Sequence, residues 1–160
     1  MRRIPTLIIF IFATTCAVIT PKVFAGDFTF GAMTGPMILD IPGDPDNPTN
    51  GGIVLGYELG VVLADLSVEA NLTKTLNKGD NDSEVDTAGL YLALRTPGPI
   101  YFKARGGFVS WDYSNKNESF DDSGASYGLG IGFSLALLLI EVDFTQIDDD
   151  INFVSVGVRF

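Results

Sequence analysis

The sequence has no histidine and only one cysteine, Cys16. Without histidine, the commonest activating partner of a serine or thiol nucleophile is missing, as is the commonest general base. Cys16 lies within the first 25 residues, which have the pattern of a cleaved leader, so the remaining chain has neither a thiol nor a disulfide. We therefore predict that the protein is not an enzyme and takes no cofactor.

Basic residues are also scarce, since 10 Lys and Arg stand against 20 Asp and Glu, and the formal net charge is −10. Arg2, Arg3 and Lys22 belong to the leader, so its removal brings the charge to −13. Nucleic-acid binding depends on cations that neutralise phosphates. The composition therefore excludes nucleic acid as a partner.

The first 25 residues have the three parts of a secretory signal peptide. Two arginines precede an apolar run over Leu7–Ile19, and Val23-Phe24-Ala25 then leads to a cleavage before Gly26. The run is too short to cross a bilayer as a helix, which takes about 20 residues. We predict a signal peptide over 1–25 and one domain over 26–160. A lipoprotein processed at Cys16 is the weaker alternative, because the residues before it match the usual pattern poorly.

Beyond the leader, the chain lacks both a long apolar run and a sustained 3.6-residue periodicity, so transmembrane helices are not expected. Short segments instead alternate between apolar and polar residues, and Gly, Pro, Asn and Asp cluster between them. This pattern predicts eight strands, over Phe28–Gly35, Gly52–Val62, Asp65–Leu76, Val85–Thr96, Ile100–Tyr113, Gly124–Leu135, Leu138–Ile147 and Ile151–Phe160.

The two faces of these segments differ in kind. Ile140 and Val142 share one face of a predicted strand, whereas Glu141 and Asp143 share the other. Uniformly apolar faces on strands of about ten residues fit a membrane-spanning barrel, which must close because unpaired backbone groups are costly in lipid. The predicted fold class is all-β, an eight-stranded antiparallel up-and-down transmembrane β-barrel with its apolar face outward.

The links between the predicted strands alternate in length. Polar links over 40–50, 77–84, 114–123 and 148–150 alternate with tight ones over 63–64, 97–99 and 136–137. External loops and periplasmic turns of small barrels alternate in this way. An even number of strands then places both termini on the side of the short turns. The apolar run over Leu135–Ile140 fits a turn poorly and has no firm explanation.

In the fifth segment, alternation places Phe102 and Phe108 on the same face, but polar residues occupy that face further along the strand. We predict a glycine bulge at Gly106-Gly107 that exchanges the faces and directs Trp111 and Tyr113 to the membrane interface. Together with Phe120, these two aromatic residues are the predicted contact residues of the third loop.

The segment Ile140–Phe160 resembles the closing hairpin of the eight-stranded outer-membrane proteins, and Tyr127–Phe133 resembles their penultimate hairpin. That family includes the transmembrane domain of OmpA, OmpX and the opacity-type surface proteins. The resemblance implies the outer membrane of a Gram-negative bacterium, with Phe160 as the insertion signal read by the barrel assembly machinery. It also implies outer-membrane lipids and lipopolysaccharide as partners, and a host or envelope protein as a further one.

A barrel of eight strands has a lumen just wide enough for side chains to fill. Eight charged residues fall on the predicted inner faces, and we expect them to form a neutralising network: Glu58, Glu69, Arg95, Lys103, Arg105, Glu141, Asp143 and Arg159. Glu141 and Asp143, about 7 Å apart by strand rise, also allow a hydrolytic pair, but interior ion pairs are the preferred interpretation.

The predicted function is a structural or surface-interaction role, adhesin-like, through acidic loops. The alternatives are a narrow-pore porin, a membrane-embedded lipid-modifying enzyme, and a soluble secreted barrel that binds a small apolar ligand. No metal site is predicted, because the segments that begin at Asp44 and Asp80 start like calcium loops but lack later ligands.

Overall fold

The computed structural model describes residues 26–40, 47–61, 64–78, 82–116, 118–135 and 138–160. The predicted signal peptide lies outside these residues and stays a prediction. The strands are β1 (Asp27–Leu39), β2 (Thr49–Val61), β3 (Ala64–Asn77), β4 (Glu84–Arg95), β5 (Ile100–Ser114), β6 (Ser119–Leu135), β7 (Leu138–Asp148) and β8 (Ile151–Arg159). In the described part of the chain, no helix is long and apolar enough to cross a membrane.

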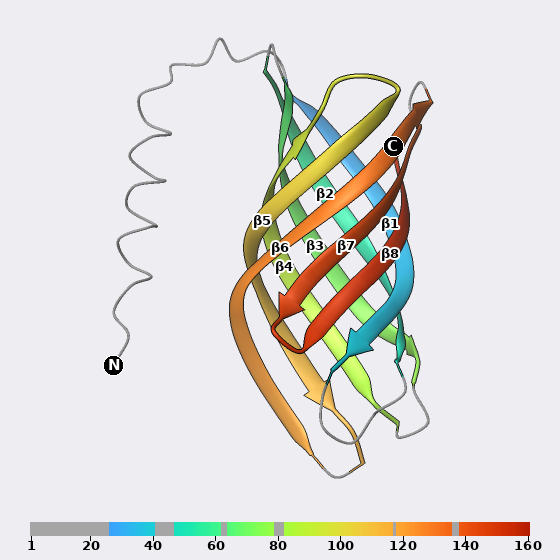
Figure 1. Cartoon of the computed structure of the whole chain (residues 1–160), viewed down its shortest axis with the longest axis vertical. Helices are drawn as coiled ribbons and strands as arrows, with labels where there is room; N and C mark the ends of the chain where they lie inside the picture. The colour runs from blue at the N-terminus through green and yellow to red at the C-terminus, as the bar shows by residue number, and fades with distance from the viewer. Residues whose placement is uncertain (1–25, 41–46, 62–63, 79–81, 117, 136–137) are drawn as a thin grey trace, which may run out of the picture.

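Each strand pairs antiparallel with the next, and β1 pairs with β8 to close the sheet (Figure 1). The closing seam runs from Gly31 opposite Arg159 to Leu39 opposite Ile151. The start of β1 and the end of β8 lie at the same end of the barrel, as expected for an even number of strands. The predicted fold class, an all-β eight-stranded antiparallel up-and-down barrel, is confirmed.

Two strands, β1 and β6, extend furthest beyond their predicted bounds. β1 continues past Gly35 to Leu39, because β8 offers ladder partners on both sides of Pro36. A proline in a strand lacks a backbone donor, so the sequence pattern stops at this position although the strand does not. β6 begins at Ser119 rather than Gly124, because its acidic first residues pair with β5.

Strand β5 keeps the same two faces along its whole length. Its register with β4 and β6 is continuous across Gly106 and Gly107, so the predicted bulge is wrong. Ser110 and Asp112 face outward like Phe108 before them. The change from apolar to polar residues therefore marks the edge of the apolar band rather than an exchange of faces.

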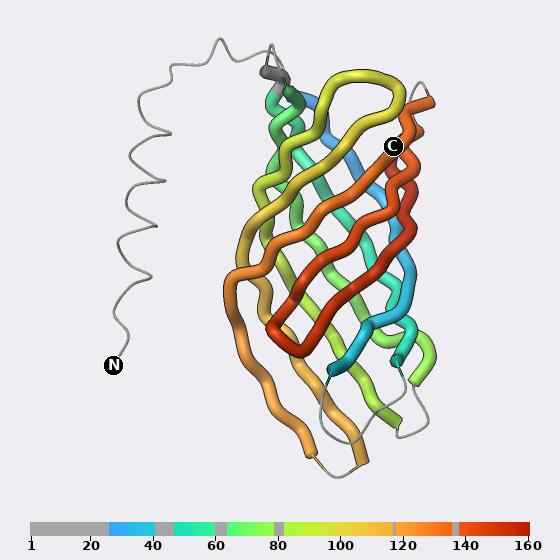
Figure 2. The backbone as a smooth tube through the Cα atoms, in the orientation of Figure 1, coloured from blue at the N-terminus to red at the C-terminus, as the bar shows by residue number. Residues whose placement is uncertain are grey.

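The barrel wall differs in height around its circumference. β6 pairs with β5 as far as Ser119 opposite Ser114, but it pairs with β7 only from Tyr127 opposite Gln146. The β5–β6 hairpin consequently extends well beyond the β7–β8 hairpin (Figures 1 and 2). We call residues 108–125 the protruding hairpin.

The links at the protruding end are 40–48, 78–83, 115–118 and 149–150, and those at the opposite end are 62–63, 96–99 and 136–137. The third link at the protruding end is shorter than the predicted 114–123, because the hairpin strands take up most of it. Residues 136–137, within the unexplained apolar run, lie outside the described residues, while Leu135 pairs with Leu138 next to them.

Candidate functional site: charged lumen and protruding hairpin

The centre of the lumen holds a cluster of buried charges around Lys103 of β5. Its Nζ lies 3.4 Å from Glu69 Oε2, 3.0 Å from Glu141 Oε2 and 3.2 Å from Asp143 Oδ2. These carboxylates come from β3 and β7, so one ammonium joins three strands. Because Lys103 is 2% exposed and Glu69 is fully buried, water contributes little to their solvation.

Arg159 of β8 provides the second strong link. Its Nη1 lies 2.6 Å from Glu69 Oε1 and its Nε lies 2.9 Å from Glu141 Oε2. The Tyr101 hydroxyl donates a hydrogen bond of 2.9 Å to Glu141 Oε1. Glu69 and Glu141 are therefore each held between the Lys103 ammonium and the Arg159 guanidinium.

The remaining charges extend the cluster in two directions. Arg105 donates to Thr145 Oγ1, and its Nη1 lies 3.9 Å from Glu69 Oε2. Arg95 pairs with Glu58 nearer the end of the barrel where the chain terminates. The structure thus places all eight predicted interior charges in the lumen. Six form one cluster, with three acids and three bases: Glu69, Lys103, Arg105, Glu141, Asp143 and Arg159.

Sequence reasoning missed the uncharged members of this site. The Arg105 guanidinium lies 4.8 Å from the centre of the Tyr91 ring, and the Arg95 guanidinium lies 5.5 Å from that of Tyr101. The hydroxyls of Tyr91 and Ser126 are 3.2 Å apart. Tyr91 and Tyr101 share the inward parity of Arg95 and Lys103 on their strands, so the alternation itself contained the signal.

An apolar layer fills the lumen on the side of the protruding hairpin. Most of its members lie toward the loop ends of their strands, as Leu39 at the end of β1 and Ile151 at the start of β8 illustrate. The buried cluster consists of Met33, Met37, Leu39, Val85, Val109, Trp111, Tyr113, Ile147, Ile151 and Phe153. The alternation of the sequence predicted a polar interior and not this apolar layer, which stands in series with the charge cluster.

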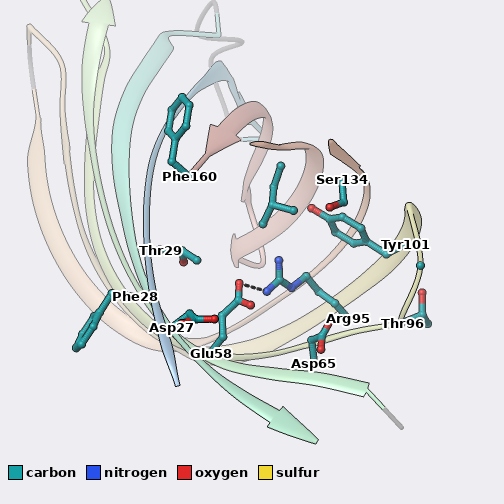
Figure 3. Close-up of a pocket in the computed structure, with 12 residues that line it drawn as sticks. Asp27, Phe28, Thr29, Glu58, Asp65, Arg95, Thr96, Tyr101, Ser134 and Phe160 are labelled. Carbon is teal, nitrogen blue, oxygen red and sulfur yellow. Dashed lines mark hydrogen bonds and ion pairs between the residues drawn. The ribbon is translucent and has the colours of Figure 1, made fainter. Parts of the chain in front are cut away.

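The opposite mouth of the barrel opens into a cavity of about 490 Å³ (Figure 3). Arg95 and Glu58 point toward each other at its base, and Asp27 and Asp65 line it nearby. The Glu58 side chain is 25% exposed, whereas that of Glu69 is fully buried. Water therefore reaches the Arg95–Glu58 pair from this mouth and not the deeper cluster.

The outer surface of the barrel is apolar. Leu129 and Val156 are 68% and 53% exposed, whereas Glu141 and Asp143 are 3% and 6% exposed. A contiguous apolar exterior of this kind is typical of barrels surrounded by lipid. The orientation required by the soluble alternative, with apolar residues inside and these two carboxylates outside, is therefore wrong.

The three predicted contact residues lie in the protruding hairpin but not all on its surface. Trp111 and Tyr113 face the lumen and are 5% and 2% exposed, so their predicted place in an external interface belt is wrong. Phe120 is 39% exposed, and its ring centre lies 5.5 Å from that of Trp111 and 4.7 Å from that of Tyr113. Continuous pairing of β5 with its neighbours keeps the two buried rings inside.

The two ends of the barrel also carry features that bear on assembly and surface charge. Phe160 is 55% exposed, its backbone pairs with Phe30, and the two rings stack with centres 5.7 Å apart. Its role as an insertion signal stays a prediction.

In the second loop, the hydrogen bond and the negative charge of Glu84 raise the pKa of the Lys78 ammonium.

Among the described residues, no group of three or more acidic, histidine or cysteine side chains converges to hold a metal ion. The segments that begin like calcium loops start at Asp44 and Asp80, which lie outside the described residues.

A closed barrel of eight antiparallel strands, with charges inside and an apolar exterior, is the architecture of the small outer-membrane barrels. The family resemblance predicted from the closing hairpins is therefore confirmed at the level of the fold. Barrels of this architecture reside in the outer membrane, which is the predicted localisation. No protein-family model and no curated protein matches the sequence.

Three solved structures show the likeness. Ail, the attachment invasion locus protein of Yersinia pestis, is 14% identical with a TM-score of 0.53, over 84% of this chain and 97% of that one. Neisserial surface protein A is 13% identical with a TM-score of 0.55, over 85% and 98%. The N-terminal β-barrel domain of Pseudomonas aeruginosa OprF is 11% identical with a TM-score of 0.50, over 84% and 99%.

Proposed function

We propose that this chain is an integral outer-membrane protein whose plugged barrel anchors an acidic hairpin that contacts a partner outside the cell. The observation that carries the proposal is the difference in height between the hairpins. In the described strand pairings, residues 119–125 of β6 have ladder partners in β5 only, because β7 pairs with β6 from Tyr127 onward.

An unpartnered strand edge presents a row of backbone donors and acceptors. A partner that adds an extended segment to such an edge gains main-chain hydrogen bonds, while its side chains provide specificity. The hairpin therefore offers a binding mode that needs neither a deep pocket nor a catalytic group.

The charges of the hairpin restrict the chemistry of the partner. Asp112, Glu118, Asp121 and Asp122 stand against Lys116 in this segment. Ail has been crystallised with the heparin analogue sucrose octasulfate, a polyanion. An acidic hairpin disfavours a polyanion, so the partner proposed for this chain is a neutral or cationic protein segment.

The lumen supports an anchoring role over transport or catalysis. The charge cluster and the apolar layer lie in series across it, which disfavours a narrow pore. Glu141 and Asp143 both contact the Lys103 ammonium, so neither is free to act as a general acid or base in a hydrolytic pair. Insertion by the barrel assembly machinery and contacts with lipopolysaccharide are further parts of the proposal.

The proposal is tested by shortening the hairpin. Residues 112–121 are replaced by an Asn-Gly turn, and bacteria that display either form in equal amounts are compared for adhesion to epithelial cells and for self-aggregation. Adhesion or aggregation that depends on the hairpin supports the proposal, and an Asp121→Asn, Asp122→Asn variant measures the contribution of charge. If both properties are unchanged in the shortened form, a purely envelope-stabilising role is the better account.

A further inference from the structure

The mouth of the barrel beside the chain ends has more carboxylates than its own cations neutralise. Asp27, Glu58 and Asp65 line the cavity of about 490 Å³, and Arg95 is the one cationic side chain among its lining residues (Figure 3). These four side chains leave a formal charge of −2. We call this cavity the acidic mouth.

The strand register explains why two of the carboxylates lack a partner. Asp65 of β3 lies opposite Arg95 of β4, but the Arg95 guanidinium pairs with Glu58 of β2 instead. Asp27 of β1 lies opposite Glu58, which carries a charge of the same sign. Within the described residues, the side chains of Asp27 and Asp65 form neither an ion pair nor a hydrogen bond.

The base of the acidic mouth contains polar atoms that the protein does not pair. The Arg95 side chain is 4% exposed, yet its Nε has no hydrogen-bond partner in the described part of the chain. The same holds for the buried Oγ1 of Thr29, which also lines the cavity. Since buried polar atoms are normally paired, these two atoms point to a polar occupant that enters together with bound water.

The spacing of the two unpaired carboxylates restricts the occupant. Asp27 and Asp65 lie on β1 and β3, on either side of β2, so their backbones are about 10 Å apart. One metal ion cannot bind both, because its oxygen ligands lie at about 2–2.6 Å. Two ammonium groups on one short alkyl stem can reach both. Leu139 and the ring of Tyr101 line the same cavity and offer the stem apolar contacts.

We propose that the acidic mouth binds an aliphatic diamine, with one ammonium at Asp27 and the other at Asp65. The two positive charges of the diamine match the formal charge of −2, and an acidic cleft with low-dielectric walls concentrates cations. A ligand with a single amine leaves one carboxylate unpaired. The acidic mouth and the protruding hairpin lie at opposite ends of the barrel, so this proposal is independent of the partner that the hairpin contacts.

The test titrates putrescine into the full mature chain, refolded in zwitterionic detergent micelles at low ionic strength because salt screens exposed charges. Isothermal titration calorimetry should show one saturable site. Butylamine, which has the same alkyl stem but one amine, should bind more weakly by on the order of tenfold, since it lacks one charge-assisted contact. Equal affinities for the two amines, or no saturable heat with putrescine, would overturn the proposal.

Three variants locate the site. Asp27→Asn and Asp65→Asn should each weaken putrescine binding by on the order of tenfold. Asp149→Asn is the matched control, because it removes one exposed carboxylate at the opposite end of the barrel and should leave the affinity unchanged. Heat-modifiable gel migration checks that each variant is folded. Equal weakening in all three would mean that the net charge of the protein, and not the acidic mouth, attracts the amine, which contradicts the proposal.

Discussion

Lys103 illustrates how much of the interior depends on single residues. Its ammonium is the shared partner of Glu69, Glu141 and Asp143, and the first of these carboxylates is fully buried. Removing one member of a buried ion network leaves its partners without a neutralising charge. The resulting loss of stability is far larger than the net stability that the intact network adds over apolar packing.

We therefore predict that Lys103→Met destabilises the barrel by about 3–5 kcal/mol. The measurement is urea unfolding, followed by the heat-modifiable shift between folded and unfolded bands on a gel. Lys116→Met is the matched control, because its pair with Asp82 is exposed and is worth less than about 1 kcal/mol.

A second substitution separates charge from packing at this position. Glu141→Gln added to Lys103→Met removes one of the uncompensated carboxylates, so the double variant should be more stable than Lys103→Met alone. If instead the two losses simply add, the Lys103 stem rather than its charge is what the barrel requires.

Phe160 carries a prediction about assembly rather than stability. Phe160→Ala should lower the amount of protein that reaches the outer membrane of cells, since the family resemblance assigns the terminal aromatic residue to recognition by the assembly machinery. Refolding of the same variant into detergent micelles should be nearly normal, because the ring is 55% exposed and stacks on the ring of Phe30 at the barrel surface. Equal losses in cells and in micelles would indicate a packing role instead.

At the scale of one strand, β6 shows that its glycines have different purposes. A Cβ at Gly132 would collide with the ring of Tyr101, which holds Glu141, whereas a Cβ at Gly124 would meet open space. We predict that Gly132→Val destabilises the barrel by about 1–3 kcal/mol through overpacking of the lumen. Gly124→Val should be neutral or stabilising, and the same unfolding gels compare the two. A similar loss in both would show that β6 requires backbone freedom rather than space.

The strands also show what alternation can and cannot predict. All eight strands and the inward position of all eight charges follow from side-chain parity, because a lipid-facing wall tolerates few exceptions. The end of β1 and the start of β6 do not follow from parity. In the sequence, Pro36 and the acidic first residues of β6 look like the ends of strands, but the partner strands continue the ladder past them. Parity also misled at β5, where polar outward residues mark the end of the apolar band.

The burial of the aromatic residues in the protruding hairpin could not be predicted from alternation, because it depends on which strands lie next to them. Trp111 looks exposed in sequence because polar residues flank it, yet it joins an apolar layer assembled from β5 and four other strands. The same holds for the unpartnered edge of β6, which exists only because β7 and β8 are short. Pairwise register, not composition, decides both features.

On the scale of the whole molecule, two unlike barriers lie in series within one lumen. Near its middle, six ionised groups form a neutral cluster, and toward the protruding hairpin an apolar layer of ten residues follows. An ion that crossed the charge cluster by exchanging ion-pair partners with its residues would then meet the apolar layer, which offers no ligands. Opening one barrier alone therefore leaves the other closed.

This arrangement predicts the electrical behaviour of the protein in planar lipid bilayers. The wild-type barrel should show no steady conductance steps, and Lys103→Met should show none either, because Met37, Trp111 and Phe153 still fill the lumen beyond the charge cluster. A conductance should require truncation on both sides, for example Lys103→Ala combined with Trp111→Ala and Phe153→Ala. Stable steps in Lys103→Met would mean that the apolar layer yields to ions, and stable steps in the wild type would favour the narrow-pore porin over the plugged anchor.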